Sequence, residues 1–127
     1  MRPGTLCYSP YVYRWEHMGK TSADILPGTL DMLILRVLAR ESLHGYGIAQ
    51  RIRELSDEVL QIGESSLYPA LQRLLLNDYV DAEWAASENN RRARYYTLTA
   101  RGRKHLAAER ADFDRYVTAI TRVLQLA

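Results

Sequence analysis

A chain of 127 residues fits one domain and is too short for a typical multidomain enzyme, and its hydrophobic fraction of 47% is ordinary for a globular protein. Its 17 Lys and Arg residues against 15 Asp and Glu give a net charge of only +2, so the placement of the basic residues must decide whether it binds nucleic acid. The sequence has no apolar run of membrane-spanning length and no signal-peptide pattern, and its single cysteine, Cys7, cannot form an intrachain disulfide. These features predict a soluble, cytoplasmic protein.

The N-terminal segment differs from the rest of the chain. Residues 1–25 are rich in Tyr, Pro and Gly and show no helical period, which predicts a flexible extension. Met18 is a plausible natural start, so the first 17 residues are interpreted as an upstream extension. The alternative interpretation is an aromatic arm that packs on a partner, formed by Tyr8, Tyr11, Tyr13 and Trp15.

Two amphipathic helices are predicted next. The first runs from about residue 28 to 40, with Gly28 or Thr29 as its N-cap. Its apolar positions are Leu30, Leu33, Ile34, Val37 and Leu38. After a break at residues 41–45, the second helix carries apolar residues at Ile48, Ile52 and Leu55. Gly45 and Gly47 on either side of Tyr46 imply that two helices approach closely there.

A short strand and then a third helix are predicted next in the chain. Leu60 and Ile62 alternate with polar neighbours, which favours a very short strand. The third helix is expected to begin at Ser65 or Ser66, whose hydroxyls suit an N-cap, and Pro69 then falls in its first turn. Its core-facing residues are Leu67, Leu71 and Leu74, and Asn77-Asp78 ends it.

Residues that alternate between two faces of a strand predict a hairpin of two strands at residues 79–84 and 92–98. A polar connection that contains the turn-prone pair Asn89-Asn90 joins them. Tyr96 is expected on the core side. Thr99 is expected to cap a long helix that runs to the C-terminus. Apolar residues of this helix recur at spacings close to a heptad, which is typical of a dimerisation seam. They are Leu106, Phe113, Val117, Ile120 and Leu124.

This order of elements predicts a winged helix-turn-helix: a mainly α fold with a small antiparallel β-wing at residues 26–98, followed by a dimerisation helix at 99–127. In such a domain the third helix enters the major groove, and the wing touches the backbone or minor groove. The wing clusters three guanidinium groups, as phosphate neutralisation requires. The candidate DNA-binding residues are Ser65, Ser66, Tyr68, Gln72, Arg73, Asn90, Arg91, Arg92 and Arg94. The alternatives are a solvated turn with incidental arginines, and capping with partial burial for Ser65, Ser66 and Tyr68.

Four motifs, in this order, resemble those of the PadR family of bacterial transcriptional regulators. They are Leu26–Asp31, His44–Gly47, Ser66–Leu71 and Arg94–Gly102, and the resemblance covers about Leu26 to Leu106. Two departures stand out. Ser65-Ser66 replaces the usual Gly-Ser, which puts the local turn in question, and Leu75–Asp78 replaces the usual Glu and Gly near the end of the third helix.

The resemblance implies a homodimeric repressor that binds a pseudo-palindromic operator in double-stranded DNA. It adds Tyr46 to the expected DNA contacts, and it adds the first helix, with Leu30, to the dimer interface of the C-terminal helix. It also implies release from DNA by a small aromatic or cationic effector, or by another signal. Candidate linings of an effector pocket are Trp84, Phe113 and Tyr116, for which interface packing is the alternative role.

The sequence argues against two other classes of function, an enzyme and a protein-binding module. The three histidines, His17, His44 and His105, lie in different elements, so the sequence predicts no metal site, no cofactor and no catalytic dyad, and His44 is expected to be structural. The second alternative is a winged-helix module that binds another protein and not DNA. Three arginines in the wing argue against it, because a protein-binding wing has no need of them.

Overall fold

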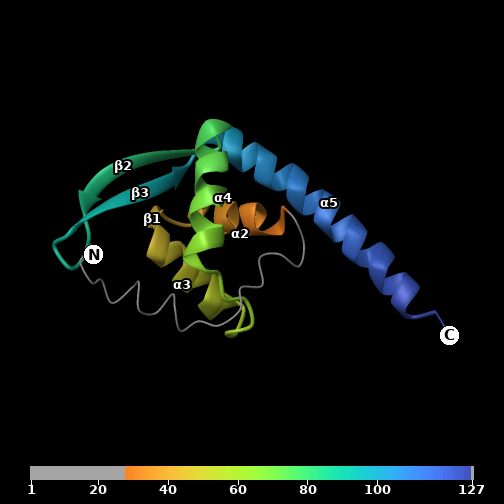
Figure 1. Cartoon of the computed structure of the whole chain (residues 1–127). Coiled ribbons are helices and arrows are strands. Elements are labelled where there is room, and N and C mark those ends of the chain that lie inside the picture. The colour runs from red at the N-terminus through yellow and green to blue at the C-terminus, as the bar shows by residue number, and fades with distance from the viewer. Residues whose placement is uncertain (1–27, 127) are drawn as a thin grey trace.

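The structure is a computed structural model that describes residues 28–126, so the expected N-terminal extension and its aromatic arm lie outside the described residues. In chain order the elements are α2 (Thr29–Leu38), β1 (Leu43–His44), α3 (Gly45–Leu55), α4 (Glu64–Leu76), β2 (Val80–Ala86), β3 (Arg92–Leu98) and α5 (Ala100–Leu124). The helices α2, α3 and α4 form the body, the β2–β3 hairpin extends from one side, and α5 projects from the other (Figure 1). The mainly helical winged-helix fold expected from the sequence is confirmed.

The core is centred on α2, which packs against α3, α4 and α5. Six of its ten residues are buried, and Ile34 and Leu35 are completely inaccessible. Fully burying one such aliphatic side chain contributes about 1.5–3 kcal/mol. Leu67 and Leu71 of α4 and Ile48 of α3 complete the core from the other helices. None of the described helices is long and apolar enough to cross a membrane.

The sheet is antiparallel, with strand order β1-β3-β2. Leu43 of β1 lies opposite Tyr96 of β3, and β2 pairs along the whole of β3. The short strand therefore precedes α3, and the strand expected around Leu60 and Ile62 is wrong. Ile62 is only 1% exposed and packs into the core from a loop. A strand of two residues is defined by its partner strand, and local alternation alone cannot locate it.

The N-terminus of one helix agrees with the prediction and that of another differs. Gly28, one of the two predicted residues, is the N-cap of α2, whereas Gly63 is the N-cap of α4 in place of a serine, and neither cap makes a side-chain hydrogen bond. Ser65 and Ser66 consequently lie inside the first turn of α4 and are not its caps. Because the helix begins at Glu64, Pro69 falls in its second turn. The end of α4 at Asn77 agrees with the prediction.

The start of α5 is fixed against the chain that precedes it. The hydroxyl of Thr99 accepts a hydrogen bond from the Gly102 N–H at 2.9 Å and donates to the Asp78 carbonyl at 2.7 Å, which confirms the predicted cap. Gly102 approaches the carbonyl of Tyr79 so closely that a Cβ atom would collide with it. The rings of Tyr79 and His105 stack with their centroids 4.1 Å apart. These contacts set the direction in which α5 leaves the body.

Candidate nucleic-acid interface

A hollow of about 670 Å³ lies between the N-terminus of α3, the helix α4 and the β2–β3 hairpin. We call it the wing hollow. It brings together five of the expected DNA-contact residues, namely Tyr46, Tyr68, Arg91, Arg92 and Arg94. Its other lining residues include His44, Trp84 and Tyr96. Residues from three separate elements thus form one concave, basic and aromatic surface.

The three wing arginines are exposed, and within residues 28–126 none of them is paired with a carboxylate. Aromatic rings support two of them. The guanidinium of Arg92 lies 5.1 Å from the ring centroid of Trp84, and that of Arg94 lies 5.9 Å from the ring centroid of Tyr96. Such contacts orient a cation without neutralising it. The positive charge of the wing is therefore available to an anionic partner such as the DNA backbone.

The turn at the tip of the wing, residues 87–91, is held by its own hydrogen bonds. Ser87 donates its N–H to the carbonyl of Arg91 at 2.6 Å, and its carbonyl accepts from the N–H of Asn90 at 2.8 Å. The N–H of Arg91 donates to the Ser87 hydroxyl at 3.3 Å. Asn90 adopts a φ of 59°, a left-handed conformation that Asn tolerates better than most residues. Asn90 does not line the wing hollow, and its evident role is to shape the turn.

The outer face of α4 is polar and exposed. Ser65, Tyr68 and Gln72 share this face at helical spacing, and all three are exposed. Tyr68 also lines the wing hollow, whereas Ser65 and Gln72 lie outside it, as does the half-buried Ser66. The exposed face of α4 and the wing hollow are therefore continuous at Tyr68.

Tyr68 lies against the start of α3. A Cβ atom on Gly45 would lie 2.7 Å from the Tyr68 hydroxyl, so any larger residue at this position would have to displace the Tyr68 ring. Although Tyr68 is 41% exposed, partial burial of its phenol against α3, reinforced by the nearby charge of Glu64, raises the pKa of Tyr68 to about 12. The hydroxyl therefore stays protonated further into the alkaline range than that of an ordinary tyrosine and can donate a hydrogen bond there.

Arg73 makes a contact within its own chain that the sequence did not indicate. Its guanidinium forms a bidentate ion pair with Asp31 of α2. Nη2 lies 2.8 Å from Oδ1, and Nε lies 3.3 Å from Oδ2. The hydrogen bond with Asp31 raises the pKa of Arg73. This bidentate pair ties α4 to α2, and because the Arg73 side chain is still 56% exposed, its contact with DNA stays a prediction.

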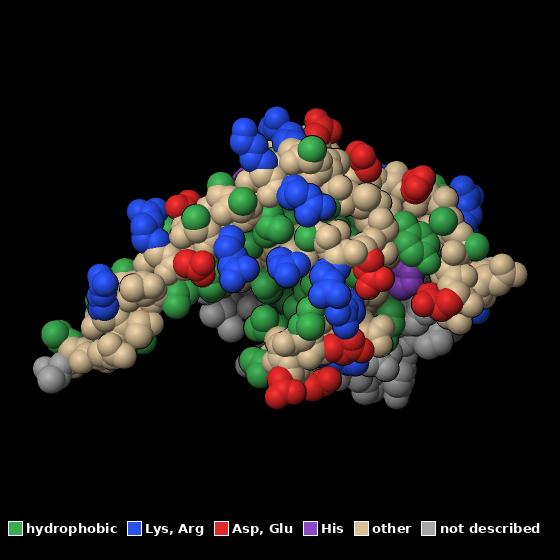
Figure 2. Space-filling model, turned by 180° about the vertical axis from the view of Figure 1, so that it is seen from behind, with side chains coloured by type: hydrophobic (Ala, Val, Ile, Leu, Met, Phe, Trp, Pro, Cys, Tyr) green, Lys and Arg blue, Asp and Glu red, His purple; other side chains and the backbone are tan. Residues whose placement is uncertain are grey.

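The expected dimer residues divide into buried and exposed sets. Leu30 is only 6% exposed and belongs to the core of its own chain, so its side chain has little surface left for a partner subunit. Leu106 and Phe113 are half-buried. Val117, Ile120 and Leu124 are 41, 52 and 78% exposed and form the solvent-facing part of the seam. Figure 2 shows hydrophobic side chains along α5 where it extends beyond the body.

The expected effector pocket is not formed as a unit. Phe113 and Tyr116 line a groove of about 260 Å³ between α5 and the start of α2. Trp84 instead lines the wing hollow, because the hairpin and α5 leave the body on different sides (Figure 1). Grouping these three aromatic residues was therefore wrong.

His44 makes a contact with the wing turn that the sequence did not reveal. It was expected to be structural, and its Nδ1 atom does cap α3 by accepting from the Gly47 N–H at 3.0 Å. It also reaches Glu88 in the wing turn. No local signal could indicate this contact, because the two residues are 44 positions apart. Within residues 28–126 no group of three or more His, Cys, Asp and Glu side chains could hold a metal ion.

The fold, the exposed face of α4 and the basic wing define a winged-helix protein suited to duplex DNA. Residues 34–108 match the model of the transcriptional regulator PadR-like family, and the chain belongs to this family. It is therefore a member of a family of transcriptional regulators and not of enzymes, and its family membership implies DNA binding.

The chain is also similar to individual proteins. The chain is 32% identical over 85 residues to an uncharacterized protein of Lysinibacillus sphaericus, covering 67% of this chain and 78% of that protein. Its fold is similar to a transcriptional regulator from Clostridium thermocellum, with 30% identity, a TM-score of 0.71 and coverage of 78% of this chain and 96% of that chain. It is also similar to a PadR family transcription regulator from Clostridium difficile, with 26% identity, a TM-score of 0.66 and coverage of 76% and 99%.

Proposed function

We propose that this protein is a homodimeric, sequence-specific DNA-binding repressor. In the proposed complex the outer face of α4 enters the major groove, and the wing arginines contact the adjacent backbone or minor groove. The observation that supports this proposal is the wing hollow, where Tyr46, Tyr68 and three arginines without a carboxylate partner in residues 28–126 meet beside the exposed face of α4. Ser65 and Gln72 on that face are the candidates for phosphate and base-edge contacts.

The proposed dimer forms through α5. One winged helix can read one half-site, so a pseudo-palindromic operator requires two subunits in a fixed relation. Val117, Ile120 and Leu124 form an exposed apolar stripe at the heptad-like spacing that helix pairing requires. In this proposal residues 26–98 bind DNA and residues 99–127 hold the two subunits together.

The proposed release mechanism uses the groove between α2 and α5. Phe113 and Tyr116 give it aromatic walls, and Glu109 and Asp112 place carboxylates at its edge. Val117 and Ile120 belong both to this groove and to the apolar stripe. A small aromatic molecule bound there would change how the two α5 helices pair, and hence the spacing of the two DNA-binding faces.

In vitro selection from a random duplex library, at two stated salt concentrations, tests the proposed function. We expect enrichment of an inverted repeat whose half-sites lie about 10–10.5 bp apart or a multiple of that distance. A scrambled version of the enriched duplex is the control. Failure to enrich any site at either salt concentration would favour a winged-helix module that binds another protein.

A further inference from the structure

His44 lies where three parts of the molecule meet. It is the last residue of β1 and the N-cap of α3, and it lies opposite Tyr95 in the pairing of β1 with β3. Its ring meets the ring of Tyr95 edge-on, with centroids 5.3 Å apart and an interplanar angle of 63°. Its side chain is only 14% exposed. The position of the imidazole is therefore set by the sheet and by the first turn of α3.

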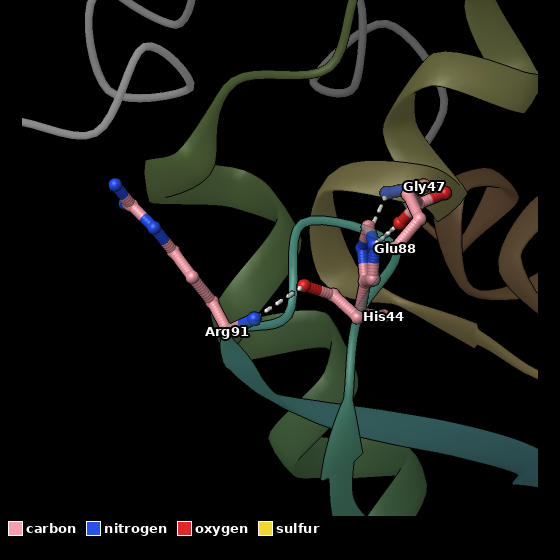
Figure 3. A network of polar contacts seen from close by, with 5 residues as sticks. His44, Gly47, Glu88 and Arg91 are labelled. Carbon is pink, nitrogen blue, oxygen red and sulfur yellow. Dashed lines mark hydrogen bonds and ion pairs between the residues drawn. The ribbon is translucent and has the colours of Figure 1, made fainter.

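The two ring nitrogens of His44 have different partners (Figure 3). Nδ1 accepts a hydrogen bond from the Gly47 N–H at 3.0 Å and must therefore be unprotonated. The single proton of the neutral ring then lies on Nε2. Nε2 is 3.5 Å from Oε1 of Glu88 and faces it as a donor. One neutral tautomer thus satisfies both contacts, and the second contact joins α3 to the wing turn.

Glu88 is an acidic residue in the wing turn, and the basic residues Arg91, Arg92 and Arg94 follow it closely in the chain. Its carboxylate is 79% exposed, and its pKa is lowered by a hydrogen bond from its own backbone N–H and then by His44. Arg91 follows in the same turn, its N–H held by the hydroxyl of Ser87 (Figure 3). A carboxylate at this place repels the phosphates that the arginines attract. The contact between Glu88 and His44 explains why a carboxylate lies in this basic wing.

We propose that His44 is a positioning residue for DNA binding: through Nε2 it holds Glu88, and thereby fixes the wing turn relative to α3 and α4. Capping α3 alone does not need an imidazole, because the side-chain oxygen of Asn or Ser serves as well. The imidazole adds a second polar atom on the opposite side of the ring, directed at the wing. This inference rests on the proposed function, since DNA binding is its first readout.

The test compares two substitutions that remove the same charge. Glu88→Gln removes the charge but keeps an oxygen that accepts from Nε2 of His44, whereas Glu88→Ala removes both. The loss of negative charge tightens DNA binding equally in the two variants. We therefore expect Glu88→Gln to bind the selected duplex more tightly than the unmodified protein, and Glu88→Ala to bind about two- to five-fold more weakly than Glu88→Gln, the range of an exposed pair.

A second background isolates the role of His44. His44→Asn keeps a side-chain cap for α3 but does not present Nε2 to the wing. In this background Glu88→Ala and Glu88→Gln should bind DNA equally. Equal affinities of the two Glu88 variants in the presence of His44 would overturn the proposal, and this comparison stands even if His44→Asn does not fold.

Amide hydrogen exchange in the free protein separates this inference from the proposed function. The N–H groups of Asn90 and Arg91 are hydrogen-bonded within the wing turn. We expect them to exchange faster in Glu88→Ala than in Glu88→Gln, while the amides of α3 are unchanged. If the unmodified protein binds no duplex, the proposed function fails and the exchange rates still decide the inference. Identical exchange at Asn90 and Arg91 in both variants would refute the positioning role.

Discussion

Replacing Arg91, Arg92 and Arg94 together by Ala should reduce the salt dependence of DNA binding by an amount that the structure specifies. Each chain carries three wing guanidinium groups without a carboxylate partner within the described residues, and a dimer carries six. Each phosphate contact contributes about 0.9 to the slope of log K against log salt. If all six contact phosphate, the slope falls by about 5 in magnitude. Because the lost contacts carry no sequence information, affinity falls for specific and scrambled duplexes alike.

Fluorescence anisotropy of a labelled duplex, measured between about 50 and 200 mM salt, gives this slope. The matched control replaces Arg36, Arg40 and Arg51, which line a separate hollow of about 180 Å³ together with Val37 and Leu55. This control removes the same number of charges but leaves the wing intact, so its slope should stay close to that of the unmodified protein. Equal slopes for the two triple variants would refute the assignment of the wing to phosphate.

Three further predictions concern the dimer, the fold and the titration of one tyrosine. Ile120→Glu should give a monomer in light scattering, whereas Thr118→Glu, on another face of α5, should leave a dimer; a persistent dimer in both would place the interface elsewhere. Gly102→Ala should lower the free energy of unfolding in urea by about 1–3 kcal/mol, because the added Cβ collides with the carbonyl of Tyr79, and an unchanged midpoint would contradict the packing. The pKa of Tyr68 is raised to about 12, so its stabilising contribution is complete below about pH 10 and is lost as the pH rises toward 12; the ultraviolet titration of the protein minus that of Tyr68→Phe should have its midpoint well above 10.

The elements with a clear period were predictable from the sequence. The apolar stripe of α2 and the alternation that places Tyr96 in the core both appear as expected, and Thr99 caps α5. In these segments the local pattern and the tertiary packing favour the same structure. The wing cluster was predictable for a similar reason, because three arginines within four residues have little structural use.

The errors arose where long-range contacts decide the structure. The strand Leu43–His44 exists because β3 offers it a partner, and Ile62 is buried in a loop, so neither could be inferred from alternation. The pairing of Arg73 with Asp31 could not be inferred either, because the two residues are 42 positions apart in the chain. Trp84 was grouped with residues of α5 because the direction in which the hairpin leaves the body is a tertiary feature.

In the proposed complex duplex DNA lies against α4 and the wing hollow. Hydrogen exchange of the protein with and without its selected duplex shows which amides the DNA covers. We expect protection of the first two turns of α4 and of the wing around residues 87–94, with no change at Arg36, Arg40 or Arg51. Protection confined to these three arginines or to α5, with exchange in the wing unchanged, would contradict the proposed complex.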